Sequence, residues 1–217
     1  MAPRWLSYVV IAAAAFAVCG LLYTLRASRA FAPRRNFAPA KGSGRAGIRY
    51  ALFAGMMPWA KESASQHLLT YFTGILYHFG IAAAFIVLIA TLVSYEVSGS
   101  AVTVLIAVTL VGAVAGIGLL VKREVNRTLR SISTPDDFLS NGLVTIFLVV
   151  AAATLWKPEF SAAFLIIATM LFLYIPAGKI RHCLLFFSSR VTFGSFFGRR
   201  DVLPHHNGAK EESHVSQ

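Results

Sequence analysis

Two histidines lie inside apolar segments of this 217-residue chain, where ionisable side chains are rare. His182 follows Tyr174-Ile-Pro-Ala-Gly-Lys-Ile-Arg and precedes Cys-Leu-Leu-Phe-Phe, and His78 lies in Leu76-Tyr-His-Phe-Gly80. An ionisable group at bilayer depth is costly and usually has a function. These two side chains are therefore the first candidates for a functional site.

Two facing neutral imidazoles can supply iron with two axial nitrogens. His78 and His182 are thus predicted to be the axial ligands of one haem, a site with no open position that transfers single electrons and does not bind oxygen. No Cys-x-x-Cys-His motif is present, so the haem would be b-type. The alternative is that each histidine donates a hydrogen bond to a backbone carbonyl in the bundle.

The composition predicts an integral membrane protein. Hydrophobic residues make up 57% of the chain and charged residues 13%, and the mean hydropathy is +0.67. Cys19 and Cys183 both lie in apolar segments and indicate no disulfide. The net charge of +11 is placed between apolar segments and not along one face, so we expect no nucleic-acid partner.

Apolar segments of spanning length predict an all-α bundle of five transmembrane helices. The segments are 5–25, 68–95, 101–121, 138–156 and 161–188. The first is expected to be a retained helix, with a cleaved signal peptide as the alternative. Thr134-Pro135-Asp136-Asp137 predicts the start of the fourth helix, and Lys157-Pro158 its end.

Basic residues predict the orientation. Eighteen of the twenty Lys and Arg residues fall in 26–61, 122–130 and 179–210. By the positive-inside rule the N-terminus is outside and the C-terminus is cytoplasmic, in a multi-pass protein of the cell membrane.

The organisation expected along the chain has four parts. Residues 1–25 form the first transmembrane helix and 68–190 a four-helix haem-binding core. Residues 26–67 form a basic cytoplasmic connection, which lacks fixed structure over 26–47 and is interfacial over 49–61, and 191–217 form a cytoplasmic tail that is disordered from residue 205. The interfacial parts of the connection and tail either lie on the membrane surface or form the seat of a soluble partner.

Helix rise places the two histidines at similar depths. With spans that begin near residue 68 and end near residue 188, His78 lies about 15 Å and His182 about 10 Å from the cytoplasmic surface. Pro176 and Gly178 interrupt the fifth segment just before His182. The interruption either aims the imidazole or is one that membrane helices tolerate without such a role.

Other residues accompany the pair. Lys179 and Arg181 either bind haem propionates or are ordinary cytoplasmic cations. His67, three turns before His78 on the same helix face, is either solvated or near a quinone headgroup or propionate. As a further haem ligand it would need His205, His206 or His214 of the tail. Gly112-Ala-Val-Ala-Gly116 and Gly118 form a small-residue face for a neighbouring helix or a macrocycle.

On these residues the sequence resembles the haem b membrane subunit family typified by the gamma subunit of respiratory nitrate reductase. The family includes membrane cytochromes of sulfite-reductase-associated and quinone-interacting redox complexes. The resemblance covers about 58–200 and is densest in Leu76-Tyr-His-Phe-Gly80, Ile175-Pro-Ala-Gly-Lys-Ile-Arg-His182, Phe186-Phe-Ser-Ser-Arg190 and Phe193-Gly-Ser-Phe-Phe-Gly198. It implies electron exchange between quinone and a cytoplasmic iron–sulfur or other redox partner.

One departure from the family concerns the second haem that its members often carry. The region 85–91 contains no histidine, and Phe164 stands eighteen residues before His182, where the family's further ligand is expected. The sequence therefore predicts one haem, near the cytoplasmic side.

The predicted function is that of an electron-transfer subunit of a quinone-linked membrane oxidoreductase, distinct from the subunit that reduces the substrate. The alternative is a haem-free membrane anchor for soluble subunits. A channel or transporter is disfavoured, because the sequence has no inverted repeat and no second cluster of polar residues within the segments.

Overall fold

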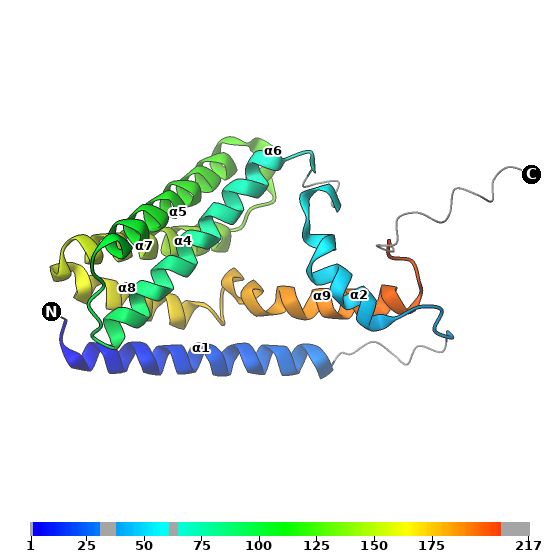
Figure 1. The fold of residues 1–217 in the computed structure, drawn as a ribbon, viewed down its shortest axis with the longest axis horizontal. Helices are drawn as coiled ribbons and strands as arrows, with labels where there is room; N and C mark the ends of the chain where they lie inside the picture. The colour runs from blue at the N-terminus through cyan, green and yellow to red at the C-terminus, as the bar shows by residue number, and fades with distance from the viewer. Residues whose placement is uncertain (1, 31–37, 61–64, 205–217) are drawn as a thin grey trace, which may run out of the picture. The chain divides into compact units, whose positions relative to one another are not determined.

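A computed structural model of the chain describes residues 2–30, 38–60 and 65–204, and every regular element in those ranges is helical (Figure 1). The chain forms two compact units. Unit 1 comprises Met1–Ala32 and Ser63–Leu184, and unit 2 comprises Pro33–Glu62 and Leu185–Gln217.

Four helices of unit 1 are long and apolar enough to cross a membrane. They are α1 (Arg4–Ala30), α4 (Leu68–Leu92), α5 (Ser100–Val125) and α7 (Pro135–Trp156). Each agrees with a predicted segment, although α1 and α5 extend further at their C-terminal ends. Several long apolar helices make the chain compatible with a multi-pass membrane protein.

The predicted fifth helix over 161–188 is not continuous. Helix α8 (Ser161–Tyr174) ends before Pro176, and a 3₁₀ turn, η4 (Lys179–Arg181), precedes α9 (His182–Arg199). The segments Pro158–Tyr174 and Lys179–Arg199 meet at 74°, so the region counts as a fifth span only if this broken pair crosses as one. Proline has no backbone N–H and disfavours a helical residue before it, which explains why the break falls here.

This break corrects the estimated depth of His182. Our value of about 10 Å assumed a straight helix that ended near residue 188. His182 is instead the first residue of α9, after the break, so the depth calculated for a straight helix does not apply to it.

Helix α7 begins where the sequence predicted. Thr134 and Asp137 form a capping box with Pro135 in the first turn, and the Thr134 N–H donates to Asp137 Oδ2 at 2.8 Å. The box satisfies amide groups that would otherwise lack partners at a helix start. It also holds the Asp137 carboxylate at the end of the helix.

Small residues set the packing of α4, α5 and α7. A Cβ on Gly112 would lie 2.6 Å from Gly80 Cα, and one on Gly116 would lie 2.5 Å from the Tyr77 ring and from Thr145 Oγ1. Gly112 and Gly116 therefore serve helix packing, whereas a Cβ on Gly118 would meet no other element within 4 Å. A Cβ on Gly20 would likewise lie 2.6 Å from Pro176 Cβ, where α1 packs on the end of α8.

Aromatic rings fill the middle of unit 1. Phe147 of α7 and Phe164 of α8 are fully buried and stack with centroids 5.2 Å apart. Phe85 of α4 packs against Phe147 and Phe172, with centroids 5.4 Å and 6.0 Å away. This cluster joins α4, α7 and α8.

Unit 2 consists of α2 (Gly44–Leu52), the 3₁₀ turns η1 (Ala54–Met56) and η2 (Pro58–Ala60), and the greater part of α9. Helix α2 packs on α9 through glycine, because a Cβ on Gly198 would lie 2.7 Å from Gly47 Cα. The Arg190 guanidinium donates to the carbonyl oxygens of Ala51 at 3.0 Å and Gly55 at 2.9 Å. Residues 38–60 of the connection and 191–204 of the tail thus belong to one folded unit. Within 26–47, which was predicted to lack fixed structure, α1 instead continues to Ala30 and α2 begins at Gly44. The rest of that prediction over 31–37, and the disorder predicted from residue 205 onwards, lie outside the described residues.

Candidate functional site

His78 lies within α4, eleven residues into a continuous helix, and its imidazole is exposed on unit 1. Its Nδ1 lies 2.7 Å from the carbonyl oxygen of Gly74, one turn earlier. A carbonyl oxygen only accepts hydrogen bonds, so Nδ1 carries the proton. In the neutral ring the lone pair is then on Nε2, which faces away from this bond.

His182 has the same arrangement in a different backbone setting. Its Nδ1 lies 2.7 Å from the carbonyl oxygen of Lys179, which belongs to the turn before α9, and its imidazole is also exposed. Within the described residues, no hydrogen bond involves Nε2 of either histidine. Both rings therefore present a nitrogen that can bind a metal.

The neighbour of His78 anchors that segment to α7. Tyr77 is buried, and its hydroxyl lies 3.0 Å from the Asn141 carbonyl oxygen and 3.1 Å from Thr145 Oγ1. Because adjacent residues of a helix are about 100° apart, this burial turns His78 outward. The sequence prediction did not include Tyr77, although a tyrosine next to a histidine of an apolar segment was visible in Leu76-Tyr-His-Phe-Gly80.

The segment before His182 is anchored to the same end of α7. Lys179 Nζ lies 2.5 Å from Asp137 Oδ2, and Arg123 of α5 lies 3.3 Å from Asp137 Oδ1. The Tyr174 hydroxyl lies 3.1 Å from Ser140 Oγ. Asp137 was predicted as a helix start only. Its pairing with Lys179 could have been inferred only from an acid and a base predicted at the same membrane surface.

These contacts place the anchors of both histidines on adjacent turns of α7. Asp137, which binds Lys179, and Asn141, which binds Tyr77, are four residues and about 6 Å apart along the helix. His78 and His182 both belong to unit 1, so this relation lies within one compact unit. The two histidine segments are therefore related to each other through α7.

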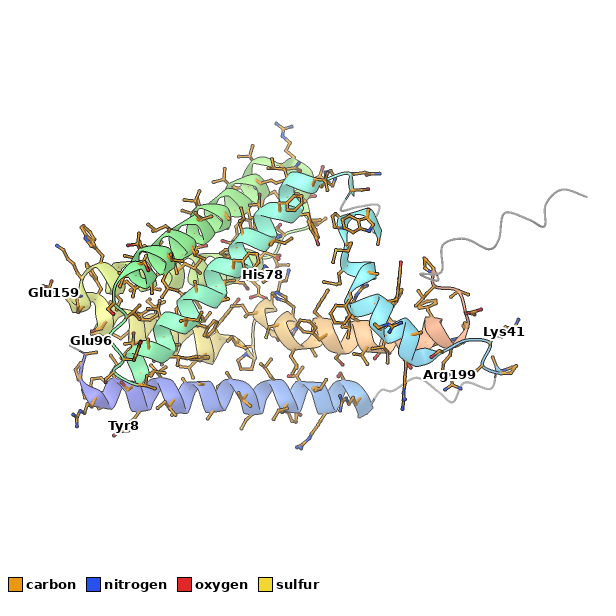
Figure 2. The ribbon with its side chains drawn as sticks, in the orientation of Figure 1. Tyr8, Lys41, His78, Glu96, Glu159 and Arg199 are labelled. Atoms are coloured by element: carbon orange, nitrogen blue, oxygen red, sulfur yellow. The ribbon has the colours of Figure 1, made fainter. Side chains whose placement is uncertain are left out.

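Figure 2 shows His78 away from the end of unit 1 that carries Tyr8, Glu96 and Glu159. The acidic Glu96 and Glu159 follow α4 and α7, respectively. The opposite ends of these helices adjoin the basic residues Lys122 and Arg123 of α5. His78 is therefore nearer to the basic end, as its position in the sequence predicted.

The remaining predicted site residues have separate positions. Lys179 forms the ion pair with Asp137 described above, so its ammonium group has a protein partner. Arg181 ends η4 and is exposed. His67 is exposed at the residue before α4 and makes no side-chain capping bond. His205, His206 and His214 lie outside the described residues.

Two histidines could supply the two axial positions of a haem iron, whereas an ion held by protein side chains alone would need more ligands. Among the described residues no group of three or more His, Cys, Asp or Glu side chains is placed to hold a metal ion. Two neutral imidazoles with available Nε2 atoms are sufficient for the two axial positions of a haem iron. Phe164, where the resemblance would place a further ligand, is packed against Phe147.

Comparisons of the chain with protein-family models, with curated proteins and with solved structures find no match. The resemblance to the nitrate reductase gamma-subunit family therefore stays a prediction from the quoted motifs.

Proposed function

We propose that the chain is a membrane electron-transfer subunit that holds one b-type haem between His78 and His182. It exchanges electrons between the quinone pool and a cytoplasmic iron–sulfur or other redox partner. In this proposal α8 and the start of α9 form the fifth, broken span, with the N-terminus outside and the C-terminus in the cytoplasm.

The observation that carries the proposal is the state of the two imidazoles. Each has its Nδ1–H engaged by a backbone carbonyl at 2.7 Å and an Nε2 without a partner among the described residues. An unpaired polar nitrogen on a membrane helix is unfavourable, so a ligand that binds it is stabilised. A hydrogen bond at the other ring nitrogen also orients a ligating histidine and increases its basicity.

Four residues of the chain would have distinct roles at the haem. His78 and His182 hold the iron from two sides, and their carbonyl acceptors keep both rings in the Nδ1–H tautomer. Tyr77 and Asp137 position the two segments on α7. When bound, a six-coordinate haem b supplies one-electron transfer without a position for oxygen.

Other polar groups have supporting roles in the proposal. Arg181 is exposed next to His182 and is available to a propionate, whereas Lys179 acts through its ion pair with Asp137. His67, exposed before the first turn of α4, is suited to accept a proton released when quinol is oxidised. The packed Phe147–Phe164 pair supports the proposal of a single haem.

The test is a haemochrome count of haem per chain, with a reduced-minus-oxidised spectrum, on the purified full chain. We expect one haem b in the wild type, and its loss or a high-spin spectrum in both His78→Ala and His182→Ala. His67→Ala is the matched control and should retain a low-spin haem.

A haem-free wild type that is folded and stable in detergent would contradict the proposal. That result would favour the alternative function, a haem-free membrane anchor. The hydrogen bonds at Nδ1 of His78 and His182 would then have no role beyond giving each ring a partner. Retention of a low-spin haem in either ligand variant would show that the residue is not an axial ligand.

A further inference from the structure

A pocket of about 960 Å³ lies entirely within unit 2. Helix α2 and the turns after it form much of its wall, with Arg49, Tyr50, Phe53, Met57 and Trp59, and Leu203 lies on the segment after α9. The volume is in the range of sites that bind small organic molecules. Its lining is mainly apolar and aromatic, with one guanidinium, from Arg49, and one carboxylate, from Asp201.

Two aromatic side chains of this pocket are mostly exposed. Trp59 is 78% exposed and Phe53 is 67% exposed. Tryptophan and phenylalanine in such positions are typical of segments that lie at the level of lipid headgroups. An apolar or interfacial environment at the mouth of the pocket would therefore cover these side chains.

The described part of unit 2 carries an excess of positive charge that favours an anionic ligand, and Asp201 is the one acidic residue that lines the pocket beside Arg49. The described part of unit 2 has six basic residues and a single acidic one, Asp201. Arg190 is engaged by backbone carbonyls, and Arg200 packs 3.5 Å from the centroid of the Phe196 ring. Arg49 lines the pocket and is exposed, and its guanidinium makes no ion pair or hydrogen bond within the described residues.

Chain connectivity keeps unit 2 near the bilayer. The segment Pro33–Glu62 follows α1 and precedes α4, both candidate spans. Only a few residues separate it from each span, and at most about 3.5 Å can be covered per residue. Membrane lipid is therefore the ligand available to this pocket at the highest local concentration.

We propose that unit 2 binds an anionic phospholipid, with the phosphate on Arg49 and the adjoining glycerol and acyl region in the pocket of Tyr50, Phe53, Met57 and Trp59. Arg49 donates to the phosphate oxygens, and the aromatic side chains lie at the headgroup level. The site makes unit 2 a lipid-specific attachment and is independent of the haem proposal.

The test uses the fluorescence of Trp59 in the full chain. Trp5 and Trp156 are both exposed, so a Trp5→Phe/Trp156→Phe variant leaves Trp59 as the single tryptophan. The variant is placed in phosphatidylcholine vesicles that contain small amounts of brominated phosphatidylglycerol or of brominated phosphatidylcholine with the same acyl chains. We expect phosphatidylglycerol to quench Trp59 at the lower mole fraction.

Two substitutions on α2 separate a site from general attraction. Arg49→Gln is expected to reduce the preference for phosphatidylglycerol about fivefold. Arg45→Gln, one turn earlier on the same exposed helix but outside the pocket, removes the same charge and should leave most of the preference. Ala46→Leu keeps all charges, fills part of the pocket and should weaken quenching by phosphatidylglycerol.

Three outcomes would overturn the proposal. Equal quenching by the two lipids would remove the anionic specificity, and equal effects of Arg45→Gln and Arg49→Gln would replace the site with general surface attraction. Absence of quenching by either lipid, with the helical circular dichroism unchanged, would assign the exposed aromatic surface to a soluble partner.

Discussion

His78 and His182 have the same hydrogen bond at Nδ1 but obtain it in opposite ways. His78 uses the carbonyl one turn earlier in an uninterrupted helix, which exists wherever α4 is helical. His182 is the first residue of α9, and its acceptor belongs to a short turn whose position depends on the ion pair of Lys179 with Asp137. The difference teaches that one candidate ligand is held by local structure and the other by tertiary contacts.

The largest difference between the two settings should come from a Gly→Ala substitution one turn before each histidine. Gly178 precedes Lys179, and a Cβ there would clash with the Tyr174 ring and lie 2.8 Å from its hydroxyl. Gly178→Ala should displace Tyr174 from Ser140, with a cost of about 1–3 kcal/mol typical of overpacking, and lower haem affinity about tenfold. Haem titration of the apoprotein and thermal unfolding measure both effects.

Gly74→Ala is the matched substitution in the setting of His78. Gly74 supplies the acceptor carbonyl for His78, and a Cβ there meets nothing within 4 Å. It should bind haem as the wild type does and gain up to about 1 kcal/mol of helix stability. Equal losses in Gly74→Ala and Gly178→Ala would contradict the difference between the two settings.

A smaller effect is expected from Asp137→Asn. The substitution keeps the shape of the side chain but removes the charge that holds Lys179 and Arg123. We expect a loss of about 1–2 kcal/mol in unfolding free energy, because charge-assisted bonds are stronger than neutral ones and this pair is partly exposed. If bound haem is present, its electron paramagnetic resonance signal should also shift, since the orientation of His182 changes.

Asp136→Asn is the control for that prediction. Asp136 is the neighbouring acid, and its carboxylate accepts only a long 3.4 Å bond from Ser140 Oγ among the described contacts. Asp136→Asn should leave the electron paramagnetic resonance signal of the haem unchanged. A shift of the same size in both variants would assign the effect to general charge and not to the Lys179 pair.

The smallest effect is expected from Tyr77→Phe. It removes the hydroxyl that contacts Asn141 and Thr145, while Thr145 Oγ1 still donates to Asn141 Oδ1 at 3.1 Å. The expected loss is about 1 kcal/mol in unfolding free energy, measured by thermal or denaturant unfolding. The ring stays packed on Gly116, so haem content should not change. A haem loss equal to that of His78→Ala would show that the α4 setting also depends on tertiary contacts.

Much of the helical architecture could be predicted because its causes are local. The apolar length of each span and the Thr134-Pro135-Asp136-Asp137 start identify α4, α5 and α7 to within a few residues. The interruption at Pro176 and Gly178 was also visible, but its size was not. A missing N–H permits a break, whereas the angle depends on what Tyr174 and Lys179 contact.

By itself, the sequence determined that the chain has several helices long and apolar enough to cross a membrane and that two histidines lie in apolar segments, because these depend on composition and local spacing. Only the tertiary structure decided that Gly112 and Gly116 face neighbouring helices while Gly118 does not. It also decided that Lys179 pairs with Asp137, and that Gly47 meets Gly194 and Gly198 in unit 2. Those contacts join residues far apart in the chain, and no local pattern specifies which distant surface a side chain will meet.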